Sequence, residues 1–368
     1  MTARHSLVVL AAGGTGGHLF PAEALARALI RRGRPVALVT DKRGKEFPVE
    51  GVDTYRVRAG RLGGGVVGKA RFALDLGRGI LEARRLLGRL KPATVVGFGG
   101  YPSMPTMVAA TTLRLPTLIH DQNAVLGRAN KMLATRVRAI ATSFDTVSGV
   151  PAADRGKIER TGNPVRPAVV AVREQPYEAP EAGGPVRLLI IGGSQGARIL
   201  SRVLPDALKA LPAELKARLV VSQQVRPEDQ ETVAAAYRDS GLNVETRRFF
   251  DDIPARLASA HLVIARAGGS TTAELTVAGR PALLVPFAGA IADEQTANAR
   301  VLVDRGAAWL LSEADFTAER ASELLTRLLG DGPALAHAAA AARDLGEPAA
   351  AERLADLVER LTMDGGRP

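Results

Sequence analysis

Two short glycine-rich loops, GGTGG at 13–17 and GGSQG at 192–196, lie about half a chain apart in a sequence of 368 residues. Each loop follows an apolar run, Ser6 to Ala12 in the first half and Val186 to Ile191 in the second. Each is followed by apolar residues at helical spacing. A buried strand, a glycine turn and a helix form the opening of a Rossmann-like α/β domain. We therefore predict an α/β protein with two Rossmann-like domains that face a cleft.

The domain boundaries follow from chain length and from a change in composition. A single core seldom extends over so many residues. The segment from Gly162 to Gly184 is rich in proline and glycine and lacks periodicity, which is typical of a linker. We predict a first domain over residues 1–163, a second over 164–345, and a C-terminal helix within 346–368 that packs back toward the first domain.

Glycine at the carboxyl end of a strand allows backbone amides to approach a phosphate or sugar oxygen. A tight packing turn is the alternative for each loop, but two matched loops favour ligand binding. A third glycine turn, with Gly99, Gly100 and Tyr101, follows the apolar residues around Val95 and has the same alternative. The segment 120–123, HDQN, ends another predicted strand over 116–119, and polar clusters at strand ends are often functional.

In the second half, the predicted strand over 260–265 leads into AGGSTTAE, a helix start rich in amides and hydroxyls. Glu274 lies about one turn inside that helix. This arrangement suits a diphosphate and an adjoining ribose diol, although an ordinary capped helix is the alternative. Gln295 and Asn298 could share a helix face and bind sugar hydroxyls.

Composition excludes several classes of function. The absence of cysteine excludes disulfides, thiol nucleophiles and Cys-ligated zinc. The formal net charge of +11 favours anionic partners. The basic residues are dispersed and aromatic residues make up only 4 %, so we expect no nucleic-acid partner. No apolar run is long enough to span a bilayer, and no signal-peptide cleavage site follows the N-terminus, so we expect a cytosolic protein.

Eight motifs in order carry a family resemblance: GGTGGH, GFGGYPS, HDQN, TGNPVR, GGSQGAR, FFDDIP, RAGGSTTAE and DEQTANA. Together they resemble the MurG family of glycosyltransferases over nearly the whole chain. The resemblance implies the GT-B fold and inverting transfer of N-acetylglucosamine from UDP-N-acetylglucosamine to the 4-hydroxyl of the muramyl sugar of lipid I, which gives lipid II. The sequence departs from the family pattern at Asp121, where Glu is usual, and at Gly289, where some members have His.

The resemblance also implies roles for individual residues. In the second domain, Phe250 would pair with uracil, Glu274 would bind the ribose hydroxyls and Gln295 would bind the sugar. In the first domain, Gly99, Gly100 and Tyr101 are candidate acceptor-binding residues. The remaining donor-binding candidates match family positions near the diphosphate or the transferred sugar: Thr15, Gly16, Gly17, Asn123, Arg166, Ser194, Gly269, Ser270 and Thr271.

Inversion requires a base that takes the acceptor proton while the diphosphate leaves. We favour His18, directly after the first glycine loop, because the ordinary histidine pKa of about 6.5 lies near the working pH. A contact with the acceptor diphosphate and a purely structural role are alternatives. No aspartates in the candidate site have metal-ligand spacing, and Asp251 and Asp252 suit helix capping. We therefore predict no cofactor and no obligatory metal.

A membrane-borne acceptor requires a surface that meets the bilayer. Phe72, Leu76 and Ile80 share one face of a predicted helix over 65–90, among basic residues between positions 69 and 85. An amphipathic basic helix would bind anionic inner-leaflet lipids; packing of that stripe into the core is the alternative. By resemblance we expect a peripheral protein at the cytoplasmic face of the plasma membrane, associated with cell-wall and division machinery.

Two other functions fit parts of the pattern. Asp41 ends a predicted strand at the distance expected of a ribose-binding acid, which favours a nucleotide-dependent oxidoreductase, but GGTGGH lacks the GxGxxG spacing. A glycosyltransferase of the same fold with another lipid or small-molecule acceptor is the second alternative.

Overall fold

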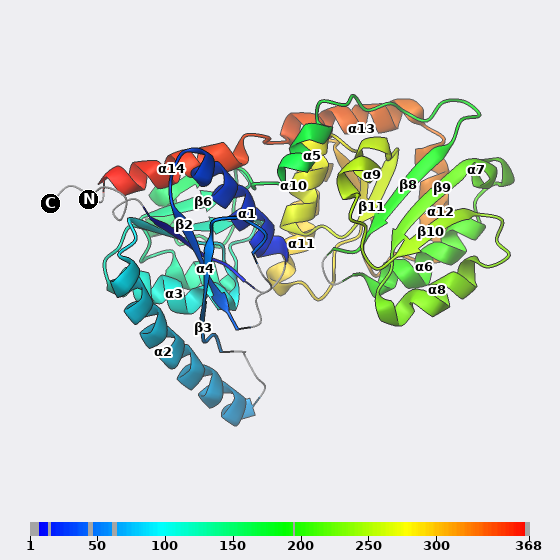
Figure 1. Ribbon diagram of the computed structural model, residues 1–368. Helices are drawn as coiled ribbons and strands as arrows, with labels where there is room; N and C mark the ends of the chain where they lie inside the picture. The colour runs from blue at the N-terminus through cyan, green and yellow to red at the C-terminus, as the bar shows by residue number, and fades with distance from the viewer. Residues whose placement is uncertain (1–6, 14–15, 43–46, 61–64, 194–195, 365–368) are drawn as a thin grey trace. The chain divides into compact units, whose positions relative to one another are not determined.

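The computed structural model divides the chain into two compact units (Figure 1). Unit 1 comprises Met1–Arg166 and Pro348–Pro368, and unit 2 comprises Pro167–Glu347. The structure describes residues 7–13, 16–42, 47–60, 65–193 and 196–364. The last segment of the chain therefore belongs to the same unit as the first.

In its described part, unit 1 has a parallel seven-stranded sheet in the order β3-β2-β1-β4-β5-β6-β7. The central strands are buried along their whole length because helices cover both faces of the sheet. The strand order reverses between β1 and β4, where open α/β sheets bind ligands at the carboxyl ends of the strands. The strands are β1 (Val8–Ala11), β2 (Val36–Asp41), β3 (Asp53–Val57), β4 (Thr94–Gly97), β5 (Thr117–Asp121), β6 (Ala139–Thr142) and β7 (Ile158–Arg160).

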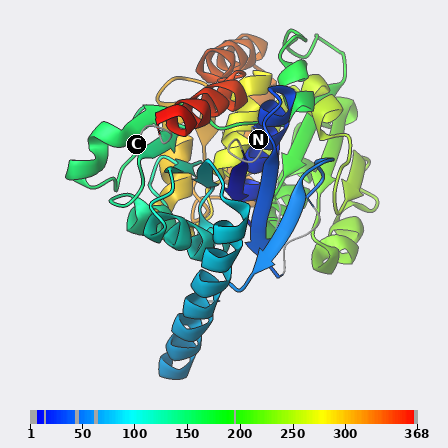
Figure 2. The same ribbon diagram turned by 60° about the vertical axis from the view of Figure 1, so that its left-hand side comes forward.

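Helices α1 (Gly16–Arg31) and α14 (Ala350–Asp364) cover one face of this sheet, and their apolar residues share one buried cluster. Helices α2 (Gly65–Leu90), α3 (Gly100–Thr112) and α4 (Arg128–Leu133) supply the cluster on the other face. A short 3-10 helix, η2 (Ala152–Lys157), precedes β7. In Figures 1 and 2, α14 runs beside α1 although more than 300 residues separate them in the chain.

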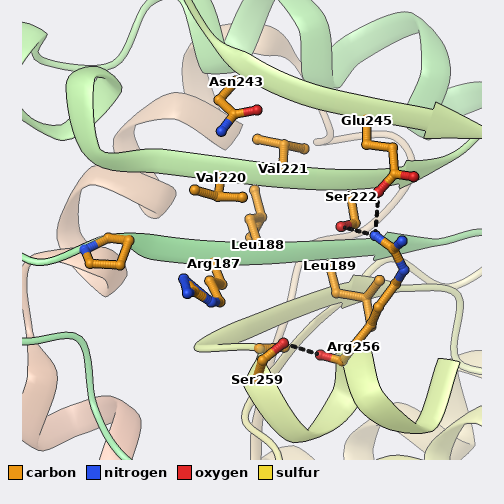
Figure 3. Close-up of a pocket in the computed structure, with 12 residues that line it drawn as sticks. Arg187, Leu188, Leu189, Val220, Val221, Ser222, Asn243, Glu245, Arg256 and Ser259 are labelled. Atoms are coloured by element: carbon orange, nitrogen blue, oxygen red, sulfur yellow. Dashed lines mark hydrogen bonds and ion pairs between the residues drawn. The ribbon is translucent and has the colours of Figure 1, made fainter. Parts of the chain in front are cut away.

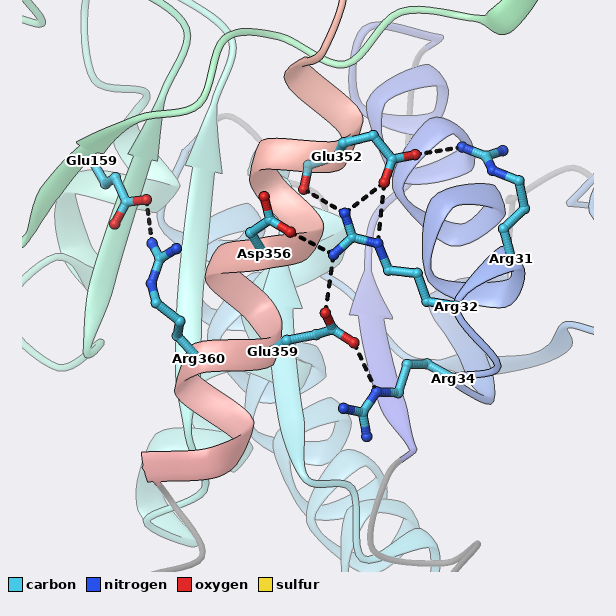
Figure 4. A network of polar contacts seen from close by, with 8 residues as sticks. All are labelled: Arg31, Arg32, Arg34, Glu159, Glu352, Asp356, Glu359 and Arg360. Atoms are coloured by element: carbon cyan, nitrogen blue, oxygen red, sulfur yellow. Dashed lines mark hydrogen bonds and ion pairs between the residues drawn. The ribbon is translucent and has the colours of Figure 1, made fainter.

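Ion pairs hold α14 against α1 (Figure 4). The Arg32 guanidinium contacts Glu352 and Asp356, each at 2.6 Å, and Glu359 at 3.0 Å. Beneath these pairs, the Leu354 side chain is fully buried. Ion pairs that are this exposed add little to the free energy of unfolding by themselves. Burial of the apolar face of α14 therefore provides most of the stabilisation of this helix on unit 1.

Helix α2 packs on α3 with the face that includes Leu76 and Ile80, both partly buried against the core. The Phe72 and Tyr101 rings pack in a T-shaped arrangement, with their centroids 5.7 Å apart. A Cβ atom on Gly79 would clash with the carbonyl oxygen of Arg58, just after β3, so α2 passes too close to that segment for any side chain there. The candidate membrane residues Phe72, Leu76 and Ile80 thus pack against unit 1, which was the alternative to membrane contact.

Among the side chains of α2 that the structure describes, the large apolar ones left exposed are Leu74 and Leu81, at 55 % and 56 %. They lie seven residues apart, which places them on the same helix face. Arg71, Arg78 and Arg85 repeat at the same interval and are also exposed. The exposed amphipathic surface of this helix is therefore a different one from the surface predicted.

In its described part, unit 2 has a parallel six-stranded sheet in the order β10-β9-β8-β11-β12-β13. Helices α6, α8 and α12 pack over one face in a single buried cluster, and α5, α9, α10, α11 and α13 contact one another beyond it. The strands are β8 (Val186–Ile191), β9 (Leu219–Gln224), β10 (Asn243–Arg247), β11 (Leu262–Ala265), β12 (Ala282–Leu284) and β13 (Ala308–Leu310). The helices are α5 (Pro167–Val172), α6 (Arg198–Lys209), α7 (Ala213–Arg218), η3 (Pro227–Asp229), α8 (Gln230–Tyr237), α9 (Ile253–Ser259), α10 (Gly269–Ala278), η4 (Ile291–Asp293), α11 (Glu294–Val303), α12 (Ala318–Leu329) and α13 (Gly332–Leu345).

Several elements differ from the predicted bounds. Helix α5 lies inside the predicted linker, where buried Val169 and Val172 are too few to show a helical period in the sequence. Strand β5 continues through Asp121, past the predicted end at residue 119.

Candidate functional site

Strand β5 brings a polar cluster to the carboxyl edge of the unit 1 sheet. The strand ends with His120 and Asp121, and Gln122 and Asn123 follow it directly. His120, Asp121 and Gln122 are at most 3 % exposed. Buried polar groups of this kind require hydrogen-bond partners, and the partners define the site.

A chain of hydrogen bonds joins this strand end to His18 on α1. The His18 Nδ1 atom lies 3.1 Å from Gln122 Oε1. The Gln122 Nε2 atom lies 3.0 Å from His120 Nδ1 and 3.1 Å from the carbonyl oxygen of Phe98. At the far end, His120 Nε2 lies 3.0 Å from the carbonyl oxygen of Gly162. The candidate base is thus connected to the HDQN segment.

Burial lowers the pKa of His18, and the charge of Asp121 opposes that shift. Burial also lowers the pKa of His120, to about 4. Because the ordinary histidine pKa is about 6.5, both rings are neutral at neutral pH. A neutral imidazole retains a nitrogen lone pair that can accept a proton.

The glycine turn before α3 lies against the His18 ring. Gly99 and Gly100 have φ angles of +85° and +70°, which glycine adopts readily and other residues rarely do. A Cβ atom on Gly100 would lie 3.2 Å from His18 Nε2. The backbone of this turn therefore packs closely on the imidazole and leaves no room for a larger side chain at Gly100, so two acceptor candidates lie next to the candidate base. Tyr101, the third, packs against Phe72.

Asp121 organises the loop after β5. Its carboxylate accepts hydrogen bonds from the Gly127 amide at 2.8 Å, the Asn130 side chain at 2.9 Å and the Asn123 amide at 3.1 Å. Burial raises the pKa of Asp121, while these three donors oppose the shift. The sequence offered no signal for Asn130, since this contact depends on how α4 packs at the end of the strand.

The remaining unit 1 candidates lie around the start of α1. The helix begins at Gly16, with Gly17 next and His18 following. The Arg166 guanidinium lies over the Phe20 ring at 4.8 Å, which brings the TGNPVR segment to this helix start. Thr15 lies outside the described residues.

In unit 2, Gly192 in the loop after β8 has no room for a side chain. A Cβ atom there would clash with the backbone nitrogen of Ala197. Gln224, at the end of β9, accepts from the Gly192 amide at 3.1 Å and donates to the carbonyls of Gly193 and Arg248, each at 3.2 Å. Through these hydrogen bonds Gln224 connects the glycine loop to the segment before Phe250. No motif in the sequence indicates this role for Gln224. Ser194 lies outside the described residues.

Phe250 is buried, and the side chain of Arg256 lies over its ring. No motif in the sequence indicates this contact. The Arg256 guanidinium lies 4.0 Å from the Phe250 ring centroid. It donates to Glu245 Oε2 and Ser222 Oγ, each at 2.6 Å, and to Asp252 Oδ1 at 2.8 Å. Asp252 occupies the N-cap position of α9 but makes no capping hydrogen bond, so its carboxylate pairs with Arg256 instead of capping as predicted.

Arg256 also lines a cavity of about 420 Å³ over β8, β9 and β10 (Figure 3). Glu245, Ser222 and Asn243 are among the other lining residues. None of the donor-binding candidates that the structure describes is among the residues that line this cavity. The cavity therefore gives no support to the predicted donor site.

The start of α10 has the predicted helix-terminus arrangement. The helix begins at Gly269 after an extended Gly268. Ser270, Thr271 and Glu274 are all partly exposed. Amides at a helix N-terminus attract anions, so this end can hold a diphosphate while Glu274 remains accessible from solvent.

Arg266 holds the loop after β12 through hydrogen bonds to its backbone. Its Nη1 atom donates to the carbonyl oxygens of Val285 and Pro286, each at 3.0 Å, and contacts Glu313 at 3.1 Å. Gln295 Oε1 accepts from the Phe287 amide at 3.0 Å, so this candidate also helps to shape the loop.

Asn298, by contrast, is fully buried. Its side chain donates to the carbonyl oxygen of Ala267 at 2.9 Å. It therefore supports the turn before α10, and its amide is not placed to bind a sugar hydroxyl as the sequence suggested. Gly289, where some members of the family have His, is exposed beside the Phe287 ring.

Among the described residues, no group of three or more His, Asp or Glu side chains is arranged to hold a metal ion. No helix in the part of the chain that the structure describes is long and apolar enough to span a membrane.

Comparisons with known proteins cover nearly the whole chain. Residues 8–142 match the glycosyltransferase family 28 N-terminal domain, and residues 187–361 match the glycosyltransferase family 28 C-terminal domain. A Rhodospirillum centenum protein, "UDP-N-acetylglucosamine--N-acetylmuramyl-(pentapeptide) pyrophosphoryl-undecaprenol N-acetylglucosamine transferase", is 56 % identical over 353 residues, which are 95 % of this chain and 93 % of that protein. A Paramagnetospirillum magneticum protein of the same name is 52 % identical over 361 residues, 97 % of each chain.

A solved structure agrees with these relatives. The crystal structure of Acinetobacter baumannii MurG is similar with a TM-score of 0.77 and 31 % sequence identity, covering 96 % of this chain and 99 % of that one. Its fold, like the two parallel sheets described above, is of the GT-B class. The chain therefore belongs to glycosyltransferase family 28 and, within it, to the MurG family.

Proposed function

We propose that this chain transfers N-acetylglucosamine from UDP-N-acetylglucosamine to the 4-hydroxyl of the muramyl sugar of lipid I, with inversion, to give lipid II for peptidoglycan synthesis. The observation that carries the proposal is the 56 % identity to a transferase of that name over 95 % of the chain. The lowered pKa of His18, next to the Gly99–Gly100 turn, supports the chemistry.

In this proposal unit 2 binds the donor. The amides of Gly269, Ser270 and Thr271 at the start of α10 hold the diphosphate and stabilise its charge as the sugar leaves. Glu274 binds the ribose hydroxyls, and Phe250, braced by Arg256, presents its backbone to uracil.

Other donor contacts complete the proposal. Gln295 binds the sugar through its amide, Ser194 contacts the diphosphate, and Arg166 contributes positive charge. Thr15, Gly16, Gly17 and Asn123 approach the transferred sugar.

Unit 1 binds the acceptor beside Gly99 and Gly100. His18 Nε2 takes the proton of the 4-hydroxyl while that oxygen attacks the anomeric carbon and UDP departs. A positioned base contributes about 10²–10⁴-fold to such a step. The charge of Asp121 favours the imidazolium that forms.

We further propose that the reaction requires no cofactor and no obligatory metal, because amides and cationic side chains stabilise the leaving diphosphate. Activity in the presence of excess chelator tests this point. Loss of activity that only an added divalent cation restores would refute it.

The experiment that tests the function combines radiolabelled UDP-N-acetylglucosamine, a short-chain lipid I analogue and the full-length protein without added metal. We expect label in the lipid-extractable product. Folded protein that binds UDP yet transfers nothing would refute lipid I as acceptor and keep the donor site. Absence of UDP binding would refute the transferase proposal itself.

For localisation, we propose a peripheral protein on the cytoplasmic face of the membrane, bound to anionic lipids and associated with cell-wall and division machinery. The surface of α2 that carries Leu74, Leu81 and the flanking arginines is the contact, since basic residues attract anionic lipid while apolar side chains insert. We expect Leu74→Asp with Leu81→Asp to weaken binding to phosphatidylglycerol vesicles.

The matched control is Met132→Asp on α4, where the side chain is 60 % exposed. It should bind vesicles like the unmodified protein. Equal binding by the α2 double variant and the control would refute the assignment of this surface.

A further inference from the structure

The orientation of the Gln122 side-chain amide follows from its neighbours. A carbonyl oxygen only accepts hydrogen bonds, so the atom that faces the Phe98 carbonyl at 3.1 Å must be the amide nitrogen. The same nitrogen faces His120 Nδ1 at 3.0 Å. The amide oxygen therefore points to His18 Nδ1, at 3.1 Å.

The same reasoning assigns the proton of the buried His120. The Gln122 amide nitrogen can only donate, so His120 Nδ1 accepts and carries no hydrogen in the neutral ring. The hydrogen is then on His120 Nε2, which donates to the carbonyl oxygen of Gly162. Because the carbonyl oxygens of Gly162 and Phe98 can only accept, every donor and acceptor in this series of hydrogen bonds is assigned without conflict.

The direction of the chain determines the state of His18. Gln122 Oε1 can only accept, so His18 Nδ1 carries the hydrogen. The lone pair of the neutral ring is then on Nε2, the atom beside Gly100. A ring with the opposite tautomer would carry a hydrogen on Nε2 and could not accept a proton there.

We propose that Gln122 and His120 are positioning residues that hold His18 as its Nδ1–H tautomer, with Nε2 as the proton acceptor. This inference deepens the proposed function, on which its catalytic consequence rests. In this arrangement the Gly162 carbonyl accepts from His120 Nε2, which leaves His120 Nδ1 as the acceptor for the Gln122 amide. Neither His120 nor Gln122 contacts substrate.

The tautomers are measurable without any substrate. Long-range proton–nitrogen NMR on full-length protein labelled with ¹⁵N-histidine distinguishes the two tautomers of each ring, and the chain has 5 histidines. We expect the Nδ1–H form for His18 and the Nε2–H form for His120. His261 is an internal reference, because its Nδ1 accepts from the Arg187 amide at 3.0 Å and its hydrogen must be on Nε2. An Nε2–H tautomer at His18 would overturn the proposal.

Two substitutions of Gln122 separate positioning from packing. Gln122→Met has a similar volume but removes the acceptor, so we expect the Nδ1–H signal of His18 to be lost and kcat to fall at least tenfold, toward the ~10⁴-fold loss known for a wrong histidine tautomer. The Kd for UDP should remain within about twofold. Gln122→Glu in its protonated form retains the oxygen that accepts from Nδ1 and a hydroxyl that donates toward Phe98 and His120, so below the pKa of the new carboxyl we expect it to retain that signal and more of kcat than Gln122→Met.

The outcomes distinguish this inference from the proposed function. An unchanged kcat in Gln122→Met, or equal losses in both variants, would overturn the positioning role. If wild-type protein shows the Nδ1–H form but transfers no sugar, the proposed function fails, and the tautomer assignment stands on the spectrum alone.

Discussion

Leu354→Ala tests whether the last helix of the chain stabilises the first unit. Leu354 is fully buried, in the same apolar cluster as Leu25 and Leu29 of α1. The change removes three carbon atoms, which corresponds to about 2.4 kcal/mol of lost transfer free energy at about 0.8 kcal/mol per methylene. The cavity left behind adds to this, and buried Leu→Ala changes cost about 2.7–5.0 kcal/mol. We expect unit 1 to lose about 3 kcal/mol of unfolding free energy.

The assay is a urea titration followed by hydrogen exchange and mass spectrometry. Peptides from β1 and α1 report on unit 1, and fluorescence of Trp309, the one tryptophan of the chain, reports on unit 2. The transition of the unit 1 peptides should move to lower urea, and that of Trp309 should move less.

Met363→Ala is the matched control on the same helix. Its side chain is 64 % exposed, so the change should alter the unfolding free energy by less than about 0.5 kcal/mol. If Leu354→Ala shifted the unit 1 peptides no more than Met363→Ala does, the assignment of α14 to the unit 1 core would be refuted.

Four further predictions concern single side chains. His18→Ala should reduce turnover about 10²–10⁴-fold and leave the Kd for UDP unchanged; steady-state kinetics with unaltered kcat would remove His18 from the mechanism. Glu274→Gln should raise the KM for the donor more than it lowers kcat, and calorimetry that found unchanged UDP affinity would contradict a ribose contact. Gly100→Ala should lower kcat because its Cβ would lie 3.2 Å from His18 Nε2 in a backbone region that disfavours alanine; a fully active variant would mean that the close contact of this turn with His18 does not matter for turnover. The hydrogen bond from Arg31 and the pair with Arg32 lower the pKa of Glu352, so their small stabilisation is present in full above the ordinary glutamate pKa of about 4.3 and is lost as pH falls through the lower pKa of the folded protein; urea titrations of wild type and Glu352→Gln should therefore differ most at pH 7 and approach each other as the pH falls below that lowered pKa.

The sequence by itself determined the fold class and the positions of both glycine loops. Apolar runs that end in glycine encode parallel strands and close backbone approach locally, so β8 has the predicted bounds, Val186–Ile191. The helix start at Gly269 could be predicted for the same reason. The family followed from the order of the motifs.

Only the tertiary structure decided which surface of each element is buried and which polar groups meet. The period of α2 shows two apolar stripes, and packing on α3 selects the stripe with Leu76 and Ile80, which leaves Leu74 and Leu81 outside. The contacts of Gln122 with His18 and of Arg256 with Phe250 join side chains from separate elements. No local pattern records such contacts, because a hydrogen bond or ring contact depends on where the folded chain places both partners.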